Sequence, residues 1–276
     1  MDRIVLRLGK FPFLNCVPIY HALESGKVKC ETKFKIVSGT PTETNTLLNK
    51  GELELGIISS VVYIDMVEKC LILPQLSISS YGKVKSVILF SRIPITALDG
   101  QPVMLTPHSA TSILLLKLIF SKYFGIQPRY LMGEIGQPNG EAVAGLVIGD
   151  RALRLQVEKI YPYQLDLGEI WYNLTGLPFV FGLFVVRKNV WEEYNQVVKH
   201  IWQALLASKR WGLNHLKTLA RCYSQLSLVD YWQHLNYDLT PLHLKSLELF
   251  FHYLKEAKEI ESIPLFRIIP LNSTLL

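Results

Sequence analysis

The chain has 276 residues, of which 49% are hydrophobic and 19% charged, and its 29 basic and 23 acidic side chains give a formal net charge of +6. This length and composition exclude an intrinsically disordered chain and allow one large or two modest hydrophobic cores. Because the basic residues are scattered and form no run or stripe, a small anionic ligand fits the charge better than a nucleic acid.

The cysteines and the apolar segments indicate the compartment. Cys16, Cys30, Cys70 and Cys222 have no C-x-x-C spacing and no associated histidine pattern, so neither a zinc site nor a redox motif is predicted. The amino-terminal segment lacks the apolar region and cleavage site of a secretory signal. The longest uncharged stretch, residues 170–186, contains polar residues, proline and glycine that make it a poor membrane span. We therefore expect a cytoplasmic protein with reduced thiols.

Short apolar runs alternate with helical patterns from the amino terminus onward, which is typical of βαβ units and a parallel sheet. The first series of expected strands comprises residues 4–8, 34–37, 55–58, 71–78 and 84–90. The segment Ser91-Arg92-Ile93-Pro94 then breaks the pattern. A second α/β series follows, with expected strands at residues 103–106, 129–131, 144–148 and 164–167. Two lobes are therefore predicted.

The run 179–186 is expected to be a strand that returns the chain to the first lobe, because only helical patterns follow it. Apolar and aromatic side chains recur at helical spacing in 191–205 and again in 247–254, and we interpret these stripes as core faces and not as cofactor-binding surfaces. The expected lobes are residues 1–91 with 187–276, and residues 92–186. Chain crossings near 90–92 and 179–186 would form a hinge beside a cleft, where small-ligand sites usually lie.

The most informative motif is GKFPFLNCVP, residues 9–18, in which the expected strand 4–8 leads into a turn punctuated by glycine and proline and then into a helix. Ligands of open α/β sheets bind at the carboxyl ends of strands, so Asn15 is the first candidate site residue. The alternative is that Asn15 only caps the helix that opens near Pro18, since asparagine is a favoured N-cap.

Two further strand ends in the first lobe carry hydroxyl groups. Thr40 follows the run 34–37 and precedes a proline, and Ser59 and Ser60 follow the run 55–58. A helix amino terminus presents unpaired N–H groups and a positive dipole end, so a carboxylate could be held at these positions. Plain capping explains Thr40 equally well, and the two serines either cap the next helix or face the cleft.

In the second lobe, hydroxyl residues open the apolar helix expected at 113–120, directly after a strand. This candidate anion site comprises Ser109, Ala110, Thr111 and Ser112. His108 beside it is either a general base or, as is more common for a lone loop histidine, a structural residue. Asp150 and Arg151 follow the run 144–148 and either contact the substrate or simply pair with each other at a helix start.

The sequence contains no nucleophile elbow with a Ser-His-Asp order, no phosphate-cradling glycine loop and no dinucleotide-binding fingerprint. These absences disfavour acyl transfer, phosphoryl transfer and hydride transfer as the reaction. Several segments together are more specific, and they occur in a defined order along most of the chain. They are Phe13-Leu14-Asn15 with Pro18, Gly39-Thr40-Pro41 with Asn45, Ser59-Ser60, Gly82 with Ser86-Val87, Ser109-Ala110-Thr111-Ser112, residues 148–153, Asp166-Leu167-Gly168 with Trp171, and residues 175–179. This ordered set resembles the chorismate dehydratase family of the futalosine route to menaquinone.

The resemblance implies an α/β fold with two lobes, like that of type II periplasmic binding proteins, with an interlobe cleft and a hinge. It implies that chorismate loses water to give 3-[(1-carboxyvinyl)oxy]benzoate, with no metal and no cofactor, and with neither a nucleic acid nor a membrane as partner. By the same resemblance Asn15 and Ser86 are catalytic. Strand-end geometry and the resemblance together give the substrate-binding residues as Thr40, Ser59, Ser60, Ser109, Ala110, Thr111, Ser112 and Asp150. The oligomeric state is left open.

This chain departs from the family's pattern at Cys16, Glu54 and Gly182-Leu183-Phe184, and none of these positions carries a proposed catalytic group. Two other functions stay open. The 1,4-dihydroxy-6-naphthoate synthase of the same pathway shares the fold, but a pocket histidine is expected there, and His108 is the only loop histidine near an expected strand end. A non-catalytic small-carboxylate-binding protein is the other alternative.

Overall fold

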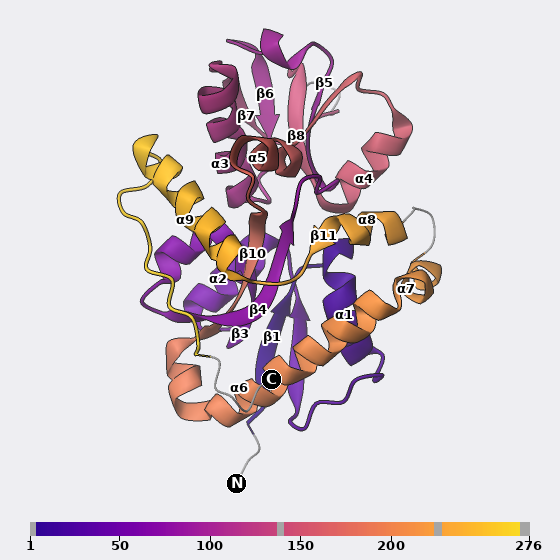
Figure 1. Cartoon of the computed structure of the whole chain (residues 1–276), viewed down its shortest axis with the longest axis vertical. Helices are drawn as coiled ribbons and strands as arrows, with labels where there is room; N and C mark the ends of the chain where they lie inside the picture. Colours follow the sequence, from indigo (N-terminus) through magenta and orange to yellow (C-terminus); the bar gives the residue numbers. More distant parts are fainter. Residues whose placement is uncertain (1–3, 137–140, 224–227, 271–276) are drawn as a thin grey trace. The chain divides into compact units, whose positions relative to one another are not determined.

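The structure is a computed structural model that describes residues 4–136, 141–223 and 228–270, and the amino-terminal residues 1–3 lie outside these ranges (Figure 1). Contacts between residues divide the chain into two compact units. Unit 1 consists of Met1–Ile78, Val180–Pro241 and Pro264–Leu276, and unit 2 consists of Ser79–Phe179 and Leu242–Ile263. Each unit is built around one mixed β-sheet.

The sheet of unit 1 has six strands in the order β11-β4-β10-β3-β1-β2. Their bounds are β1 Leu6–Lys10, β2 Phe34–Ser38, β3 Leu55–Ser59, β4 Cys70–Ser80, β10 Phe179–Arg187 and β11 Leu235–Asn236. Strand β1 pairs in parallel with β2 and with β3, whereas β10 runs antiparallel to β3. All five residues of β3 are buried, as expected for a strand inside a sheet whose two faces are covered.

The helices of unit 1 include one, α2, that begins at a clear start signal in the sequence. The helices are η1 Leu14–Cys16, α1 Val17–Glu24, α2 Pro41–Lys50, η2 Ser60–Met66, α6 Lys188–Asn214, α7 Leu216–Cys222 and α8 Leu228–His234. Helix α2 opens with a capping box between Thr40 and Glu43 and with Pro41 in its first turn. Helix α6 is the long orange helix that packs beside α1 (Figure 1), and the buried residues of its apolar stripe include Val198 and Trp202.

The sheet of unit 2 has five strands in the order β7-β6-β8-β5-β9. Their bounds are β5 Val87–Ser91, β6 Pro102–Leu105, β7 Arg129–Met132, β8 Ala144–Ile148 and β9 Tyr163–Asp166. Strand β6 is parallel to β7 and β8, and β5 is antiparallel to β8 and β9. The helices are η3 Ile95–Ala97, α3 Ala110–Ile119, the π-helical turn η4 Phe120–Phe124, α4 Gly149–Glu158, α5 Leu167–Thr175 and α9 Pro241–Glu256.

Each expected strand is present with ends that agree to within a few residues, but the division of the chain differs from the expected lobes 1–91 with 187–276 and 92–186. The first crossing lies at Ile78 and Ser79, not near 90–92. The reason is that β5 is buried along its whole length and pairs on both sides, with β8 and with β9 of the second sheet. Residues near its end therefore cannot be a crossing.

Helix α9 is a second difference, because nearly all of it belongs to unit 2 instead of covering the first sheet. The indole nitrogen of Trp171 in α5 donates a 2.9 Å hydrogen bond to the hydroxyl of Ser246, and the ring of Phe250 packs edge-on against the same indole. The predicted apolar stripe of α9 is confirmed as a core face by Phe250, Phe251 and Leu254, all of which are fully buried. No helix in the described ranges has the length and apolar character that crossing a membrane would require.

Candidate functional site

The parallel strands of unit 1 place the candidate residues of that unit at one edge of the sheet. Strands β1, β2 and β3 run in the same direction, so their carboxyl ends share an edge. Asn15 follows β1, Thr40 follows β2, and Ser59 and Ser60 lie at the end of β3. The arrangement matches the position at which open α/β sheets bind ligands.

Asn15 lies in η1, between the end of β1 and the start of α1. Neither η1 nor α1 has a side-chain cap hydrogen bond in the described structure, so the capping alternative is not realised by this residue. Its Oδ1 atom is buried and has no hydrogen-bond partner among the described residues. Because an unsatisfied buried acceptor costs about 1–3 kcal/mol, Oδ1 is suited to accept a hydrogen bond from a ligand. The indole nitrogen of Trp232 donates to the carbonyl of Leu14 at 2.8 Å and fixes the turn.

Sequence reasoning does not identify two further residues, Tyr237 and Lys209. Tyr237 is buried, and its hydroxyl likewise has no hydrogen-bond partner in the described part of the chain. Burial raises the pKa of Tyr237 well above its usual value, and the charges of Tyr231 and Cys16 add to this. The hydroxyl therefore remains protonated and able to donate.

Lys209 holds the segment that carries Tyr237. This ammonium group is buried and donates to Oδ1 of Asp238 at 2.6 Å and to the carbonyl of Gln75 at 2.7 Å. The sequence contained a signal, because Lys209 follows Leu205 at helical spacing on the apolar stripe of α6, where an unpaired cation is not expected.

The hydroxyls of Thr40 and Ser60, at the other two strand ends of unit 1, are already engaged. The Thr40 hydroxyl donates to Oε2 of Glu43 at 2.9 Å and accepts from the Glu43 amide at 3.4 Å, so the capping interpretation of Thr40 is confirmed. The Ser60 hydroxyl donates to the carbonyl of Val180 at 2.7 Å, and the Ser59 amide donates to Oδ1 of Asn45 at 3.3 Å. A ligand at this edge would thus meet helix starts that are held in place.

The candidate residues of unit 2 also share one sheet edge. Val87 of β5 pairs with Ile148 of β8, so Ser86, just before β5, lies beside the carboxyl end of β8, and the Gly149 amide donates to its carbonyl at 2.7 Å. Asp150 is in the first turn of α4. Because β6 is parallel to β8, the start of α3 after β6 lies at the same edge.

At the start of α3, Ser109 is the N-cap, and its hydroxyl accepts from the Ser112 amide at 3.2 Å. The hydroxyls of Ser109 and Ser112 lie 2.8 Å apart. Thr111 and Ser112 are buried, whereas Ala110 is exposed. The amides of the first helical turn and the helix dipole favour an anion at this point. Ser86 is buried at the same edge, and its hydroxyl is 3.4 Å from the carbonyl of Val84.

Glu134 is a charged residue that the sequence does not single out, and it contacts two residues that the sequence does, Arg151 and His108. Arg151 forms an ion pair with Glu134, which follows β7, and donates a hydrogen bond to the carbonyl of Ile135. His108 Nε2 lies 3.7 Å from Oε1 of the same carboxylate. The side chain of Arg151 is thus held by Glu134, a residue on another element. Nothing in the sequence pairs Glu134 with Arg151, because they are 17 residues apart on different elements. In the described ranges no three His, Cys, Asp or Glu side chains gather as metal ligands.

Comparison with known sequences identifies a family and two similar proteins. A family model described as menaquinone biosynthesis matches residues 6–256. Chorismate dehydratase from Thermus thermophilus is 31% identical over 281 residues, which cover 94% of this chain and 97% of that protein. The 1,4-dihydroxy-6-naphtoate synthase of the same organism is 27% identical over 213 residues, 76% of this chain and 75% of that protein.

Among solved structures, the periplasmic aliphatic sulphonate binding protein SsuA from Escherichia coli has a TM-score of 0.66 at 16% identity and covers 97% of this chain and 92% of its own. At this identity the likeness establishes the fold alone. The fold is that of periplasmic binding proteins, as the resemblance to the family implied.

Proposed function

Because the chain belongs to the menaquinone biosynthesis family, we propose that it is a chorismate dehydratase, an enzyme that converts chorismate to 3-[(1-carboxyvinyl)oxy]benzoate and water. The observation that carries the proposal is the similarity to a chorismate dehydratase along nearly the whole chain, through both units. The 1,4-dihydroxy-6-naphtoate synthase is similar over a smaller share of the chain and at lower identity.

The reaction breaks the carbon–hydrogen bond at carbon 3 and the carbon–oxygen bond at carbon 4 of chorismate. The electron pair of the first bond becomes the new ring double bond, and the departing hydroxyl leaves as water. Because the ring becomes aromatic, the protein mainly has to orient the substrate and stabilise developing charge. In our proposal the enolpyruvyl carboxylate of the substrate takes the proton from carbon 3 and passes it to the departing hydroxyl, which leaves as water, so that no protein base is required.

Asn15 and Ser86 are the proposed catalytic groups. The carboxamide of Asn15 offers one acceptor and two donors. Its buried, unpartnered Oδ1 is suited to accept a hydrogen bond from a substrate hydroxyl and so orient it, and its N–H groups can donate to the oxygen that departs. The hydroxyl of Ser86 is a second donor, positioned by the backbone hydrogen bond to Gly149. Preorganised donors of this kind stabilise charge that develops in the transition state.

The remaining residues of the proposal bind the two carboxylates and orient the ring. We assign one carboxylate to the first turn of α3, because Ser109 caps a helix of ten residues whose amino terminus favours an anion. The other proposed substrate-binding residues are Thr40, Ser59, Ser60, Ala110, Thr111, Ser112 and Asp150. The same proposal includes an interlobe cleft with a hinge and a cytoplasmic location. It includes no metal, no cofactor, and neither a nucleic acid nor a membrane as partner.

Incubation of the purified chain with chorismate, followed by mass spectrometry of the products, tests the function. We expect a product lighter than chorismate by one water. Binding without conversion would instead indicate a carboxylate-binding protein. Release of 1,4-dihydroxy-6-naphthoate from a cyclic futalosine derivative, without any dehydration of chorismate, would indicate the other enzyme of the pathway.

The role of Asn15 is tested by comparing two asparagine variants. Asn15→Ala should lower kcat by about a hundredfold, the scale for loss of one preorganised hydrogen-bonding group. Asn49→Ala is the matched control, because Asn49 lies near the end of α2 and accepts a hydrogen bond from Lys69 at its side chain. Equal kcat values for the two variants would remove Asn15 from the mechanism.

A further inference from the structure

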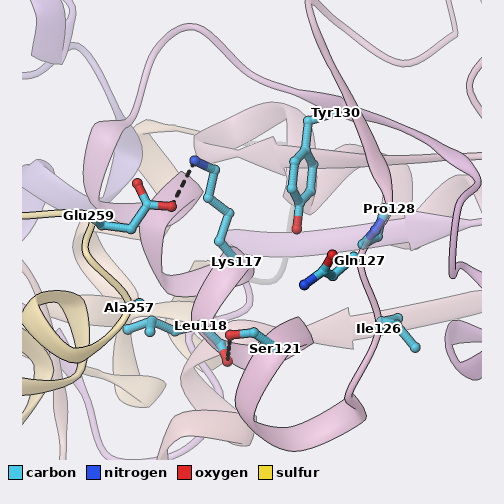
Figure 2. A pocket seen from close by; sticks show the side chains of 9 residues that line it. All are labelled: Lys117, Leu118, Ser121, Ile126, Gln127, Pro128, Tyr130, Ala257 and Glu259. Atoms are coloured by element: carbon cyan, nitrogen blue, oxygen red, sulfur yellow. Dashed lines mark hydrogen bonds and ion pairs between the residues drawn. The ribbon is translucent and has the colours of Figure 1, made fainter.

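Unit 2 contains a pocket with a volume of about 340 Å³ that no step of the proposed reaction uses (Figure 2). Its volume lies at the lower end of the range for small-molecule sites, roughly 300–1,000 Å³. The lining residues are Lys117, Leu118, Ser121, Ile126, Gln127, Pro128, Tyr130, Ala257 and Glu259. They come from the end of α3, η4, the segment before β7, β7 itself and the segment after α9.

The pocket is separate from the candidate site of unit 2. Lys117 lies eight residues after Ser109 on α3, which corresponds to about 12 Å along the helix at 1.5 Å per residue. Gln127 and Pro128 precede β7, so they lie at the amino end of that strand. The residues of the candidate site follow the carboxyl ends of β6 and β8, which run parallel to each other, and β6 also runs parallel to β7. The two sites therefore lie at opposite edges of the sheet.

One cation and one anion stand side by side in the pocket. Lys117 Nζ is 3.1 Å from Oε1 of Glu259, and both side chains are 31% exposed. The same ammonium is 5.9 Å from the ring centre of Tyr130, within cation–π distance. Figure 2 shows this ion pair across the pocket from Gln127. A ligand can reach both charges, because neither is fully buried.

The remainder of the pocket is suited to an apolar group with a polar tip. Leu118, Ile126, Pro128 and Ala257 contribute hydrocarbon, and the ring of Tyr130 offers a flat aromatic face. Burial raises the pKa of Tyr130 to about 12, and the charge of Glu259 adds to the effect, so its hydroxyl remains a hydrogen-bond donor at neutral pH. In Figure 2 this hydroxyl lies on the side of the pocket where the Gln127 amide lies.

We propose that this pocket binds a small zwitterion, a molecule that carries adjacent ammonium and carboxylate groups and an apolar or aromatic side chain. The ligand carboxylate pairs with Lys117 and its ammonium pairs with Glu259, while its side chain lies against the ring of Tyr130. A ligand with both charges can replace both partners of the ion pair. An anion alone would leave Glu259 without its cation, and a cation alone would leave Lys117 without its anion, which is costly in a partly desolvated pocket.

Three probes that differ only in charge test the proposal by isothermal titration calorimetry with the full chain. They are L-phenylalanine, which is a zwitterion, 3-phenylpropionate, which has only the carboxylate, and 2-phenylethylamine, which has only the ammonium. The zwitterion is expected to bind at least about tenfold more tightly than either single-charge analogue, because each charge-assisted hydrogen bond is worth about that factor or more.

Four variants locate the binding. Lys117→Met and Glu259→Gln should each weaken zwitterion binding by about tenfold or more. Lys122→Met is the matched control, because Lys122 forms a similar ion pair with Glu256 on α9 without lining the pocket. Asn15→Ala should bind the zwitterion as the unaltered chain does, which separates this pocket from the proposed active site.

Three outcomes would overturn the proposal. The first is a zwitterion Kd weaker than about 10 mM for the unaltered chain. The second is equal affinity for all three probes. The third is equal weakening by Lys117→Met and Lys122→Met, which would show that the ion pairs only tie α3 and η4 to the end of α9. None of these outcomes depends on whether the chain dehydrates chorismate.

Discussion

Gly212 of α6 lies where the helix meets α1, and replacing it by alanine tests the packing that supports the Asn15 turn. A Cβ atom at this position would lie 2.0 Å from the carbonyl oxygen of Pro18 and 2.8 Å from its carbonyl carbon and Cα. These atoms are all backbone, so no flexible side chain can move away. Since α1 begins two residues after Asn15, the added methyl group must push apart the two helices or displace the turn.

Two opposing terms set the size of the effect of Gly212→Ala on the free energy of unfolding. Overpacking costs about 1–3 kcal/mol, and a clash with backbone belongs at the upper end, about 3 kcal/mol. Alanine has a better helix propensity than glycine by about 1 kcal/mol, which partly offsets this cost. The net loss is therefore about 2 kcal/mol. For a protein of this size it corresponds to a fall in Tm of about 4–8 °C.

Thermal and denaturant unfolding followed by circular dichroism measure this loss. Leu213→Ala is the control, because Leu213 is the next residue on α6 and is 39% exposed, so its substitution should change stability by no more than about 0.5 kcal/mol. A Gly212→Ala protein with the same Tm as the unaltered chain, or a higher one, would show that helix propensity outweighs the clash and that α1 and α6 do not pack this closely.

Three further predictions concern the site, pH and the thiols. Ser86→Ala should lower kcat for chorismate without lowering Tm, and unchanged kcat would leave Ser86 a structural residue. Burial alone would raise the pKa of Glu54, but hydrogen bonds from Arg7 outweigh it and leave the pKa below its ordinary value. The Glu54 carboxylate therefore stabilises the fold at pH values above the pKa it has in the unfolded chain. This stabilisation is lost as the pH falls through its pKa in the folded protein. Glu54→Gln should accordingly flatten the acid limb of a stability–pH curve, and superimposable curves would contradict this. Burial raises the pKa of the Cys70 thiol to about 11. A maleimide should therefore label the exposed Cys222 in the native protein and leave Cys70 unlabelled. Peptide mass mapping measures the labelling, and equal labelling of the two cysteines would contradict the prediction.

Local patterns in the sequence were sufficient for most of the secondary structure. The expected strand 144–148 is β8 with identical bounds, and the Thr40 and Pro41 signals begin α2 at the expected residue. The stripe 247–254 was recognised as the apolar face of a helix. These features were predictable because alternation, helical periodicity and capping depend on residues within one or two turns of each other.

The same local patterns could not assign elements to units. The apolar run that became β5 fits either sheet, and only its pairing with β8 and β9 places it in unit 2. Helix α9 likewise has an apolar face that would suit either unit, and the hydrogen bond between Trp171 and Ser246 belongs to residues 75 positions apart. Strand pairing and helix docking depend on such distant contacts, which no short segment encodes by itself.

The candidate site shows the same difference between what local sequence predicts and what distant contacts decide. The sequence by itself determined that Asn15 and the Ser109 cap stand at strand ends, because the turn that follows an apolar run can be read locally. Ser86 lies inside the expected strand 84–90, and only the structure places it just before β5. Only the tertiary structure decided that Oδ1 of Asn15 is buried without a partner among the described residues, and that Lys117 meets Glu259 across 142 positions to form the pocket. Burial and ion pairing are decided by which surfaces the folded chain brings together, and the spacing of residues along the chain does not specify that.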